Sequence, residues 1–352
     1  MRKKHPQSSP TAGTNSKHKQ TLCFAAGHSG GHIIPCLTLA QQQYAQYNLL
    51  FFTSKKELDC SLISASELAI THVQLAISQQ RRWYTLPLLA LSLAWATITS
   101  FFTLLAHMPE RIITTGSIVA VPVCVAGWLL GIPIELFELN AHAGKTMHAL
   151  SYTANTIRHC FARTQLEFPR AQCILTPYPI RFAPQAIHPI AIPHFTPDRI
   201  TLFVQGGSQG SQEINALMKK VIEDAPELHE KLQVIHQAGA HLQKVTALYE
   251  QAAIPAHVFS FESHIAPYYQ AADLIMCRAG AGTLFEALHF QKRTITVPLI
   301  TRSNTHQLQN AQAMAQEHPE LFSVLLQQDG IEKIKKICNE LILVTHTATQ
   351  LL

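Results

Sequence analysis

Residues 21–40 read TLCFAAGHSGGHIIPCLTLA, in which a short apolar run passes through three glycines into a helical pattern. The apolar run predicts a buried strand, and the pattern after it predicts an amphipathic helix. Gly27, Gly30 and Gly31 therefore lie where a strand turns into a helix. Glycine allows a ligand to approach backbone amides closely, and a helix N-terminus favours negative charge. The junction thus predicts a site for a phosphate-bearing ligand, although it fits neither the P-loop nor the dinucleotide-binding spacing.

The same order of elements recurs along the chain. In the first half, short apolar runs such as NLLFFTS and IPIELFE alternate with helical patterns, which is typical of parallel βαβ units. After residue 198, the run RITLFVQ, the glycine-rich segment 206–211 and a helical pattern repeat the opening. The sequence therefore predicts an α/β protein of two doubly wound, Rossmann-like domains that face a cleft, because such sheets bind ligands at the carboxyl ends of their strands.

Six prolines between residues 177 and 197 separate the two halves, because such a segment suits neither a helix nor a central strand. We expect four parts on this basis. They are a disordered basic lead at 1–20, an N-terminal domain at 21–180, a proline-rich linker at 181–198 and a C-terminal domain at 199–352.

The composition excludes several classes of protein. With 352 residues, of which 47% are hydrophobic, the chain is long enough for two globular domains. A net charge of +5, without interleaved aromatic and basic residues, is too small to indicate nucleic-acid binding. Eight cysteines without a C-x-x-C pair indicate neither a zinc site nor a disulfide framework. The polar first 20 residues lack the apolar core of a secretory signal, so a reducing cytoplasm is the expected compartment.

Residues 83–108 contain no Asp, Glu, Lys or Arg, which meets the length criterion for a membrane span. Pro87 and the Ser and Thr content weaken that interpretation, and the strands predicted on both sides would have to share one sheet. We expect core helices with an apolar surface patch instead. Arg81 and Arg82 directly precede the segment and suit an anionic membrane surface.

Two polar residues stand at predicted helix starts. In DLIMCRAGAGTLFEAL, residues 273–288, a strand ends at Cys277 and a helix opens near Thr283, which places Glu286 in its first turn. A carboxylate there either favours the helix dipole or accepts two ribose hydroxyls, and the sequence alone favours the first role. At the first junction, the helix N-terminus disfavours the charged ring of His32, so a neutral imidazole is expected to accept a proton near pH 7.

Five blocks in this sequence resemble the MurG family of bacterial cell-wall glycosyltransferases. The blocks are GHSGGHIIP, QGGSQGSQEIN, HQAGA, AADLIMCRAGAGTLFEAL and NTHQLQNAQAM, and the likeness runs from about Leu22 to Ala315. The resemblance implies a GT-B fold and inverting transfer of N-acetylglucosamine from UDP-N-acetylglucosamine to the undecaprenyl-diphosphate-linked N-acetylmuramyl-peptide of lipid I. It also implies that the domain at 21–180 faces the membrane and receives the acceptor, and that the domain at 199–352 binds the UDP-sugar. The enzyme is then expected to be peripheral, on the cytoplasmic face of the bacterial inner membrane.

On the acceptor side, the resemblance implies that the first turn and the loop GSIVAVP at 116–122 face the acceptor diphosphate. His32 and Glu138 match polar positions near the reacting hydroxyl. We therefore expect His32 to act as the base and Glu138 to orient it or to act in its place. The expected acceptor-binding residues are Gly27, Ser29, Gly30, Gly31, Gly116 and Asn140.

On the donor side, the resemblance implies that Glu286 holds the ribose, which replaces the dipole role favoured by the sequence alone. The helix starts at 208–211 and 281–284, together with Arg181, are expected to stabilise the leaving diphosphate. No Asp-x-Asp occurs in the chain, so neither a metal ion nor another cofactor is expected. The remaining expected donor-binding residues are Ser208, Gln209, Gly210, Ala281 and Thr283 around the diphosphate and sugar, with His306, Gln307 and Asn310 on the transferred sugar.

Departures from the family pattern on the acceptor side, among them His28, Ile118 and Met147, leave alternatives open. One is a GT-B transferase that uses a UDP-sugar with another lipid or a small acceptor. Another is a catalytically weak nucleotide-sugar-binding protein at the membrane. A third is a membrane-spanning protein built on residues 83–108.

Overall fold

The structure, a computed structural model, describes most of the chain. The described residues are 19–27, 29–43, 46–78, 85–169, 171–182, 190–207, 210–301, 305–326 and 329–349. The predicted basic lead at 1–20 lies outside them except for its last two residues, and so do Arg81, Arg82, Ser208 and Gln209. The domain boundaries given above stay predictions.

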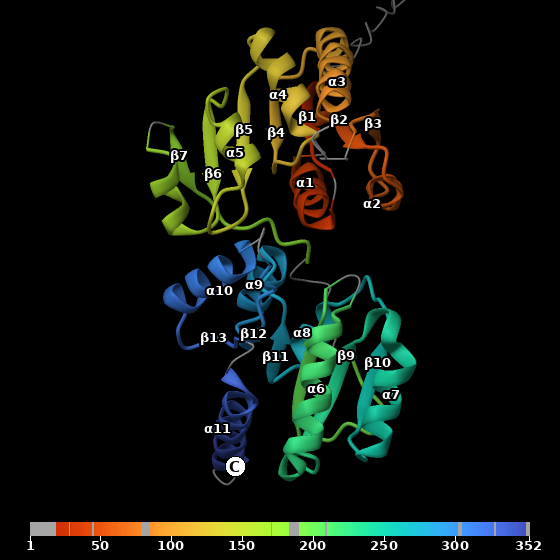
Figure 1. Cartoon of the computed structure of the whole chain (residues 1–352), viewed down its shortest axis with the longest axis vertical. Helices are drawn as coiled ribbons and strands as arrows, with labels where there is room; N and C mark the ends of the chain where they lie inside the picture. The colour runs from red at the N-terminus through yellow and green to blue at the C-terminus, as the bar shows by residue number, and fades with distance from the viewer. Residues whose placement is uncertain are drawn as a thin grey trace, which may run out of the picture.

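A seven-stranded parallel sheet forms the N-terminal domain, with the order β3-β2-β1-β4-β5-β6-β7 (Figure 1). Its strands are β1 (Gln20–Ala25), β2 (Tyr47–Ser54), β3 (Ile70–Leu75), β4 (Arg111–Thr114), β5 (Ile134–Glu138), β6 (Thr156–His159) and β7 (Cys173–Leu175). Its helices are α1 (Gly30–Gln43), α2 (Glu57–Ala65), α3 (Leu86–His107), α4 (Ala120–Leu129) and α5 (Lys145–Leu150), with the 3-10 helix η2 (Ala162–Glu167).

Alternate residues of β1 face two different helical layers. Leu22 and Phe24 pack with residues of α1 and α2, whereas Cys23 and Ala25 pack with residues of α3, α4 and α5. The ring of Phe24 also stacks on that of Phe51 in β2, with the centroids 4.9 Å apart. Because both faces of the sheet are covered, β1 is an unbroken apolar run rather than an alternating one.

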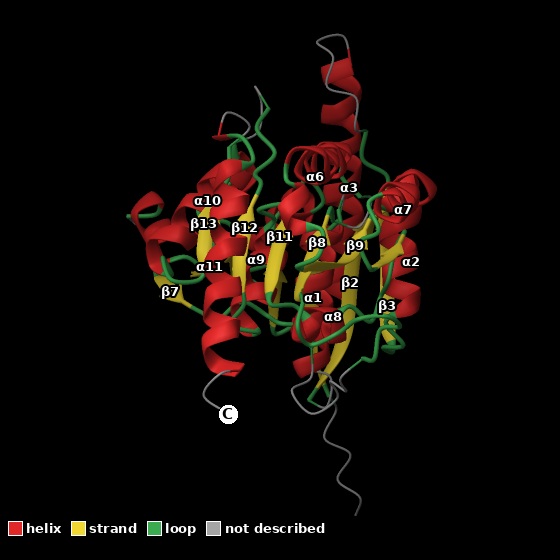
Figure 2. Cartoon of the chain, turned by 90° about the horizontal axis from the view of Figure 1, so that it is seen from below, coloured by secondary structure: helices red, strands yellow, loops and turns green. Residues whose placement is uncertain are grey.

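A six-stranded parallel sheet with the order β10-β9-β8-β11-β12-β13 forms the C-terminal domain. The helices α6, α7 and α11 pack on one face, and α8, α9 and α10 pack on the other. Figure 2 shows helices above and below the row of strands. The strands are β8 (Ile200–Gln205), β9 (Leu232–Gln237), β10 (Ala256–Phe259), β11 (Leu274–Cys277), β12 (Arg293–Thr296) and β13 (Phe322–Val324). The helices are α6 (Gln212–Asp224), α7 (Leu242–Gln251), α8 (Ala266–Ala271), α9 (Ala281–His289), α10 (His306–Glu317) and α11 (Glu332–Thr349), with the 3-10 helices η3 (Pro226–Leu228) and η4 (Gly239–His241).

Both sheets change direction at their first strand, because β1 lies between β2 and β4 and β8 lies between β9 and β11. Doubly wound sheets bind ligands at the carboxyl ends of the strands at such a switch point. The loops there are 26–29 and 115–119 in the first domain and 206–211 and 278–280 in the second. In Figure 1, α1 of the first domain and α9 and α10 of the second lie at the domain boundary, and α1 contacts α9. Both switch points therefore belong to elements that meet at this boundary.

A shared apolar cluster also joins the two domains. Leu139 and Phe161 of the N-terminal domain pack in the same buried cluster as Phe203, Tyr269 and Leu284 of the C-terminal domain. The domains are therefore packed against one another next to the loops that follow β5 and β6.

The predicted α/β class with two doubly wound domains is confirmed. Four of the strands were not predicted, namely β3, β6, β7 and β13. Three of them have only three or four residues, and β3 is exposed or half-buried at every position except Leu75. Such strands lack the long apolar run that marks the central strands.

The expectation of core helices at 83–108 is wrong, because residues 86–107 form the single helix α3, of which only Ala96, Ser100 and Leu104 are buried. The expected apolar surface patch is present. By length and composition α3 could cross a membrane, and its apolar window is only 17% buried. Large exposed apolar side chains recur along α3 every three or four residues, at Leu88, Leu91, Trp95, Ile98, Phe102 and Leu105, and these six define the apolar stripe.

Candidate active site

His32 lies in the first turn of α1 and is held by the loop after β4. Its Nδ1 lies 2.8 Å from the carbonyl oxygen of Thr115, and the Thr115 hydroxyl donates to the His32 carbonyl at 2.9 Å. A carbonyl oxygen only accepts, so we assign the hydrogen to Nδ1, which leaves the lone pair of a neutral ring on Nε2. The backbone thus sets the tautomer that a proton-accepting His32 needs.

The three glycines of the first junction differ in whether the surrounding atoms leave space for a side chain. A Cβ on Gly27 would lie 2.9 Å from Oδ2 of Asp59, a buried carboxylate that accepts from the backbone and hydroxyl of Ser54. Packing therefore requires glycine at this position. A Cβ on Gly30 or Gly31 would meet nothing closer than 3.5 Å, so packing does not require glycine there. These two are the positions whose small size leaves room for a ligand.

Gly116, in the loop after β4, has φ +96°, which a residue with a side chain rarely adopts. A Cβ there would lie 3.0 Å from Sδ of Met147 and 3.9 Å from Cε1 of His32. Met147 is buried in α5. The turn at Gly116 therefore lies between His32, the predicted base, and the side chain of Met147.

Glu138 ends β5 and is almost fully buried. Its Oε1 accepts from the backbone N–H of Asn140 at 2.9 Å and from the Asn140 amide at 3.1 Å. Burial raises the pKa of Glu138 to about 7, and the hydrogen bonds from Asn140 and the backbone N–H of Gly144 offset part of that effect. A carboxyl with this pKa exchanges a proton near neutral pH, as the predicted role of orienting or alternative base requires.

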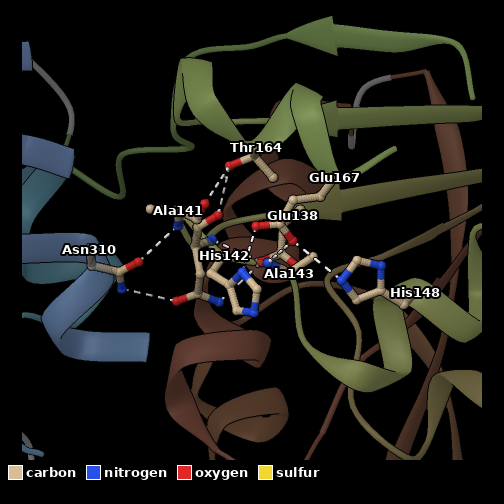
Figure 3. Close-up of polar contacts among 9 residues, drawn as sticks. Glu138, Ala141, His142, Ala143, His148, Thr164, Glu167 and Asn310 are labelled. Atoms are coloured by element: carbon tan, nitrogen blue, oxygen red, sulfur yellow. Dashed lines mark hydrogen bonds and ion pairs between the residues drawn. The ribbon is translucent and has the colours of Figure 1, made fainter. Parts of the chain in front are cut away.

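Asn310 in α10 ties the loop after Glu138 to the C-terminal domain (Figure 3). Its Oδ1 accepts from the backbone N–H of Ala141 at 2.8 Å, and its Nδ2 donates to Oδ1 of Asn140 at 3.1 Å and to the carbonyl of Ala279 at 3.3 Å. The Asn310 side chain is buried, and these partners use its acceptor and both of its donors. Two residues predicted to contact opposite substrates, Asn140 and Asn310, therefore bind each other here.

A carboxylate that the sequence analysis missed, Glu167, organises the same loop (Figure 3). It accepts from the backbone N–H of Ala143 at 2.9 Å and lies 2.6 Å from Nδ1 of His142 and 3.3 Å from Nε2 of His148. The ring of His142 lies 5.9 Å from that of His306 at the start of α10. No spacing in the sequence indicates this cluster, because Glu167 lies 25 residues beyond His142.

The predicted helix is present as α9 and begins at Ala281, close to the predicted start near Thr283. Glu286 therefore lies in its second turn, and the predicted first-turn position is wrong. Its carboxylate is 9% exposed and accepts from Nε of Arg181 at 2.8 Å and from the Arg181 Nη2 at 3.4 Å. The hydroxyl of Tyr269 lies 3.0 Å from Oε2 of Glu286 and 2.8 Å from Oε1 of Gln205. Glu286, predicted to bind the ribose, and Arg181, predicted to bind the diphosphate, are thus hydrogen-bonded to each other.

Aromatic contacts hold the segment that carries Arg181 against α9. The ring of Tyr178 stacks on Phe285 with the centroids 4.9 Å apart, and its hydroxyl would lie 3.1 Å from a Cβ on Gly282. The Arg181 guanidinium lies over the ring of Phe182, 5.0 Å from its centroid. Gly282 therefore makes room for Tyr178, which positions the segment leading to Arg181.

The remaining predicted donor residues surround the same helix starts. Thr283 lies in the first turn of α9, whose N-cap Gly280 makes no side-chain capping bond. Gly210 has φ +75°, and a Cβ there would lie 2.7 Å from Cα of Gly239, so two backbone turns touch. Gln307 in α10 accepts from the backbone N–H of Leu299 at 2.8 Å.

Among the described residues, no group of three or more His, Cys, Asp or Glu side chains has the geometry of a metal site. The roles of all these residues toward substrates stay predictions.

Known proteins resemble this chain across both domains. The family model described as the glycosyltransferase family 28 N-terminal domain matches residues 22–158, and the model described as the glycosyltransferase family 28 C-terminal domain matches residues 201–348.

A protein from Magnetococcus marinus, named UDP-N-acetylglucosamine–N-acetylmuramyl-(pentapeptide) pyrophosphoryl-undecaprenol N-acetylglucosamine transferase, is 30% identical over 307 residues, which are 83% of this chain and 81% of that protein. The protein of the same name from Myxococcus xanthus is 27% identical over 297 residues, 83% of this chain and 77% of that protein. The crystal structure of Acinetobacter baumannii MurG matches with a TM-score of 0.69 and 25% identity over 92% of this chain and 91% of that one. The chain therefore belongs to the MurG family, within glycosyltransferase family 28.

Proposed function

We propose that this chain transfers N-acetylglucosamine from UDP-N-acetylglucosamine to undecaprenyl-diphosphate-linked N-acetylmuramyl-pentapeptide, which converts lipid I to lipid II in peptidoglycan synthesis. The observation that carries the proposal is the match to relatives named for this activity over 83% of the chain. The matching family domains include the glycine junctions of both switch points and Glu286. The meeting of both switch-point elements at one boundary supports a reaction between a donor on one domain and an acceptor on the other.

The reaction is an inverting displacement at C1 of the donor sugar. The acceptor hydroxyl oxygen forms a bond to C1 from the face opposite UDP, and the bond between C1 and the diphosphate oxygen breaks, so that its electron pair leaves with UDP. The hydroxyl proton passes to Nε2 of His32, the ring atom left with the lone pair by the contact to Thr115. Glu138 acts as the orienting or alternative base.

The donor lies on the C-terminal domain. Glu286 accepts from the ribose hydroxyls, and Arg181 together with the amides at the starts of α6 and α9 balances the charge that develops on the diphosphate. The N-cap of α9 is Gly280, which has no side-chain oxygen to cap the first amides of the helix, and this supports the role. His306, Gln307 and Asn310 are assigned to the transferred sugar.

A transfer assay tests the proposal directly. The chain is incubated with radiolabelled UDP-N-acetylglucosamine and a short-chain lipid I analogue, and the products are separated by chromatography. We expect label in the disaccharide lipid. Label transferred only to another lipid or a small acceptor would favour a different GT-B activity, and UDP-sugar binding without transfer would favour the weak-binding alternative that Met147 and Ile118 motivate.

We also propose that the enzyme is peripheral, on the cytoplasmic face of the inner membrane, with the apolar stripe of α3 in the lipid interface. The six stripe residues include Trp95, 67% exposed, and Phe102, 64% exposed, and Trp128 at the end of the adjacent α4 is 59% exposed. An exposed apolar face that carries aromatic side chains suits contact with the lipid interface, where Trp is enriched.

Replacing two stripe residues tests this location. Combining Trp95→Glu with Phe102→Glu is expected to reduce partitioning onto phosphatidylglycerol vesicles at least about tenfold, because two buried aromatic rings are lost from the lipid. Sedimentation with vesicles measures the effect, and Phe261→Glu, an equally exposed aromatic on the C-terminal domain, is the matched control. Unchanged partitioning would contradict the assignment, and wild-type protein that resists carbonate extraction would instead favour a span.

A further inference from the structure

Arg181 and Glu286 satisfy each other in this structure, although each is assigned to a different part of the donor. The two side chains share a two-point contact at 2.8 and 3.4 Å, across 105 residues of sequence. The carboxylate is almost fully buried and the guanidinium is 30% exposed. A charge pair of this kind is costly to break when one partner is left alone, because the remaining charge stays desolvated.

The contacts around the pair favour a role in which Arg181 exchanges Glu286 for another anion, rather than a purely structural ion pair. The Tyr269 hydroxyl, whose single hydrogen is within reach of Oε2 of Glu286 at 3.0 Å and of Oε1 of Gln205 at 2.8 Å, stays beside the carboxylate when Arg181 moves away. Tyr178 holds the segment that carries Arg181 against α9, and the Arg181 guanidinium lies over the ring of Phe182. Arg181 is the more exposed partner of the pair. It is therefore the side chain that can turn toward an anion at the start of α9.

We infer that Arg181 competes with the ribose for Glu286. A ligand displaces Arg181 from Glu286 effectively only when it carries a diphosphate that binds the displaced guanidinium. The inference rests on the proposed function. Uridine must displace Arg181 from Glu286 and offers the guanidinium nothing in return. UDP displaces the same contact, but its diphosphate then binds Arg181 with charge-assisted hydrogen bonds. The Arg181–Glu286 pair thus favours binding of diphosphate-bearing nucleotides over binding of nucleosides.

This competition predicts opposite effects of one substitution on two ligands. Arg181→Met keeps an apolar stem over Phe182 but removes the charge that opposes uridine and holds the diphosphate. Uridine binding should become at least about threefold tighter, and UDP binding should become at least about tenfold weaker, because one charge-assisted contact is lost. A residue that merely contacts the diphosphate would weaken UDP and leave uridine unchanged.

Two further variants keep the test sharp. Tyr269→Phe is the matched control, because it removes the other donor to Glu286 without removing a charge. It should change the affinities for uridine and UDP by the same factor. Arg181→Lys retains a charge but lacks the two-point geometry, so its ratio of UDP to uridine affinity should lie between those of the wild type and Arg181→Met.

Isothermal titration calorimetry with uridine and with UDP, in one buffer, measures all four proteins, and thermal melting checks that each is folded. Tighter uridine together with weaker UDP in Arg181→Met supports the inference. Unchanged or weaker uridine binding in a folded Arg181→Met overturns it, as does an affinity ratio in Arg181→Lys outside the predicted range or an equal loss of discrimination in Tyr269→Phe. A wild type that binds neither ligand overturns the proposed function and the inference together, whereas the other outcomes bear on the competition alone.

Discussion

The two domains hold the key polar groups of the candidate site in different ways. In the N-terminal domain, His32 is bound to the backbone carbonyl of Thr115, and Glu138 accepts from the backbone of Asn140. In the C-terminal domain, Glu286 is bound to the side chain of Arg181. A ligand cannot displace a backbone partner without rearranging the loop, but it can displace a side chain. The comparison predicts that the acceptor side is organised in advance, whereas the donor side is completed by the proposed exchange at Arg181 and Glu286.

Replacing His32 is expected to have the largest effect. His32→Ala should lower kcat about 100-fold or more, because it removes a base whose tautomer the loop already sets. Steady-state transfer kinetics measure the change, and calorimetric binding of UDP serves as the control, since the donor lies on the other domain. Turnover within about threefold of the wild type would remove His32 from this role and would weaken the contrast between the two sides.

Burial of Glu138 predicts a smaller, pH-dependent effect on stability. Its pKa is raised from 4.5 to about 7 in the folded chain, so the folded state holds a proton that the unfolded state has lost between these values. The stabilising contribution of the neutral carboxyl is therefore greatest below about pH 4.5 and is lost as the pH rises through about 7. Relative to Glu138→Gln, the free energy of unfolding of the wild type should fall by about 3 kcal/mol at most between about pH 5 and about pH 8.

Chemical denaturation of both proteins at the two pH values measures this difference. The variant keeps an oxygen for the Asn140 backbone N–H, and the titrations of all other groups cancel in the comparison. A constant difference between the two proteins across this range would show that Glu138 is already ionised at low pH, and would contradict its proposed exchange of a proton near neutrality.

Asn310→Ala tests the junction between the two sides and should have the smallest of these effects. The substitution leaves the backbone N–H of Ala141 without its acceptor, which should cost about 1–3 kcal/mol of unfolding free energy. Urea denaturation measures it, with Gln312→Ala, on the exposed side of the same helix, as the control. If the two variants unfold alike, Asn310 does not join the domains.

The central strands could be predicted because burial on both faces leaves a purely apolar run, as in β1 and β8. The edge strand β3 could not, because its residues ITHVQL mix polar and apolar positions that are mostly half-buried or exposed. The helix α3 was misjudged for a related reason: an apolar sequence indicates that a segment avoids water, but not whether protein or another apolar phase covers it.

The candidate site was predictable where a motif carries it and hidden where only folding brings residues together. The small-residue loop before α9 marked Glu286, but its pairing with Arg181 crosses 105 residues and the proline-rich segment. Gly27 is predicted to bind the acceptor, and the structure gives a second reason for glycine there, because the buried Asp59 packs against it. Glycine spacing alone does not distinguish a ligand contact from a close approach of two loops.

A crystal structure of the chain with UDP tests the contrast between the two sides most directly. The account predicts that UDP lies at the start of α9, with its ribose on Glu286 and its diphosphate on Arg181, so that these two side chains are no longer within hydrogen-bond distance. The contact between His32 and Thr115 should be unchanged. UDP bound elsewhere, or bound there with the Arg181–Glu286 pair intact, would contradict the account.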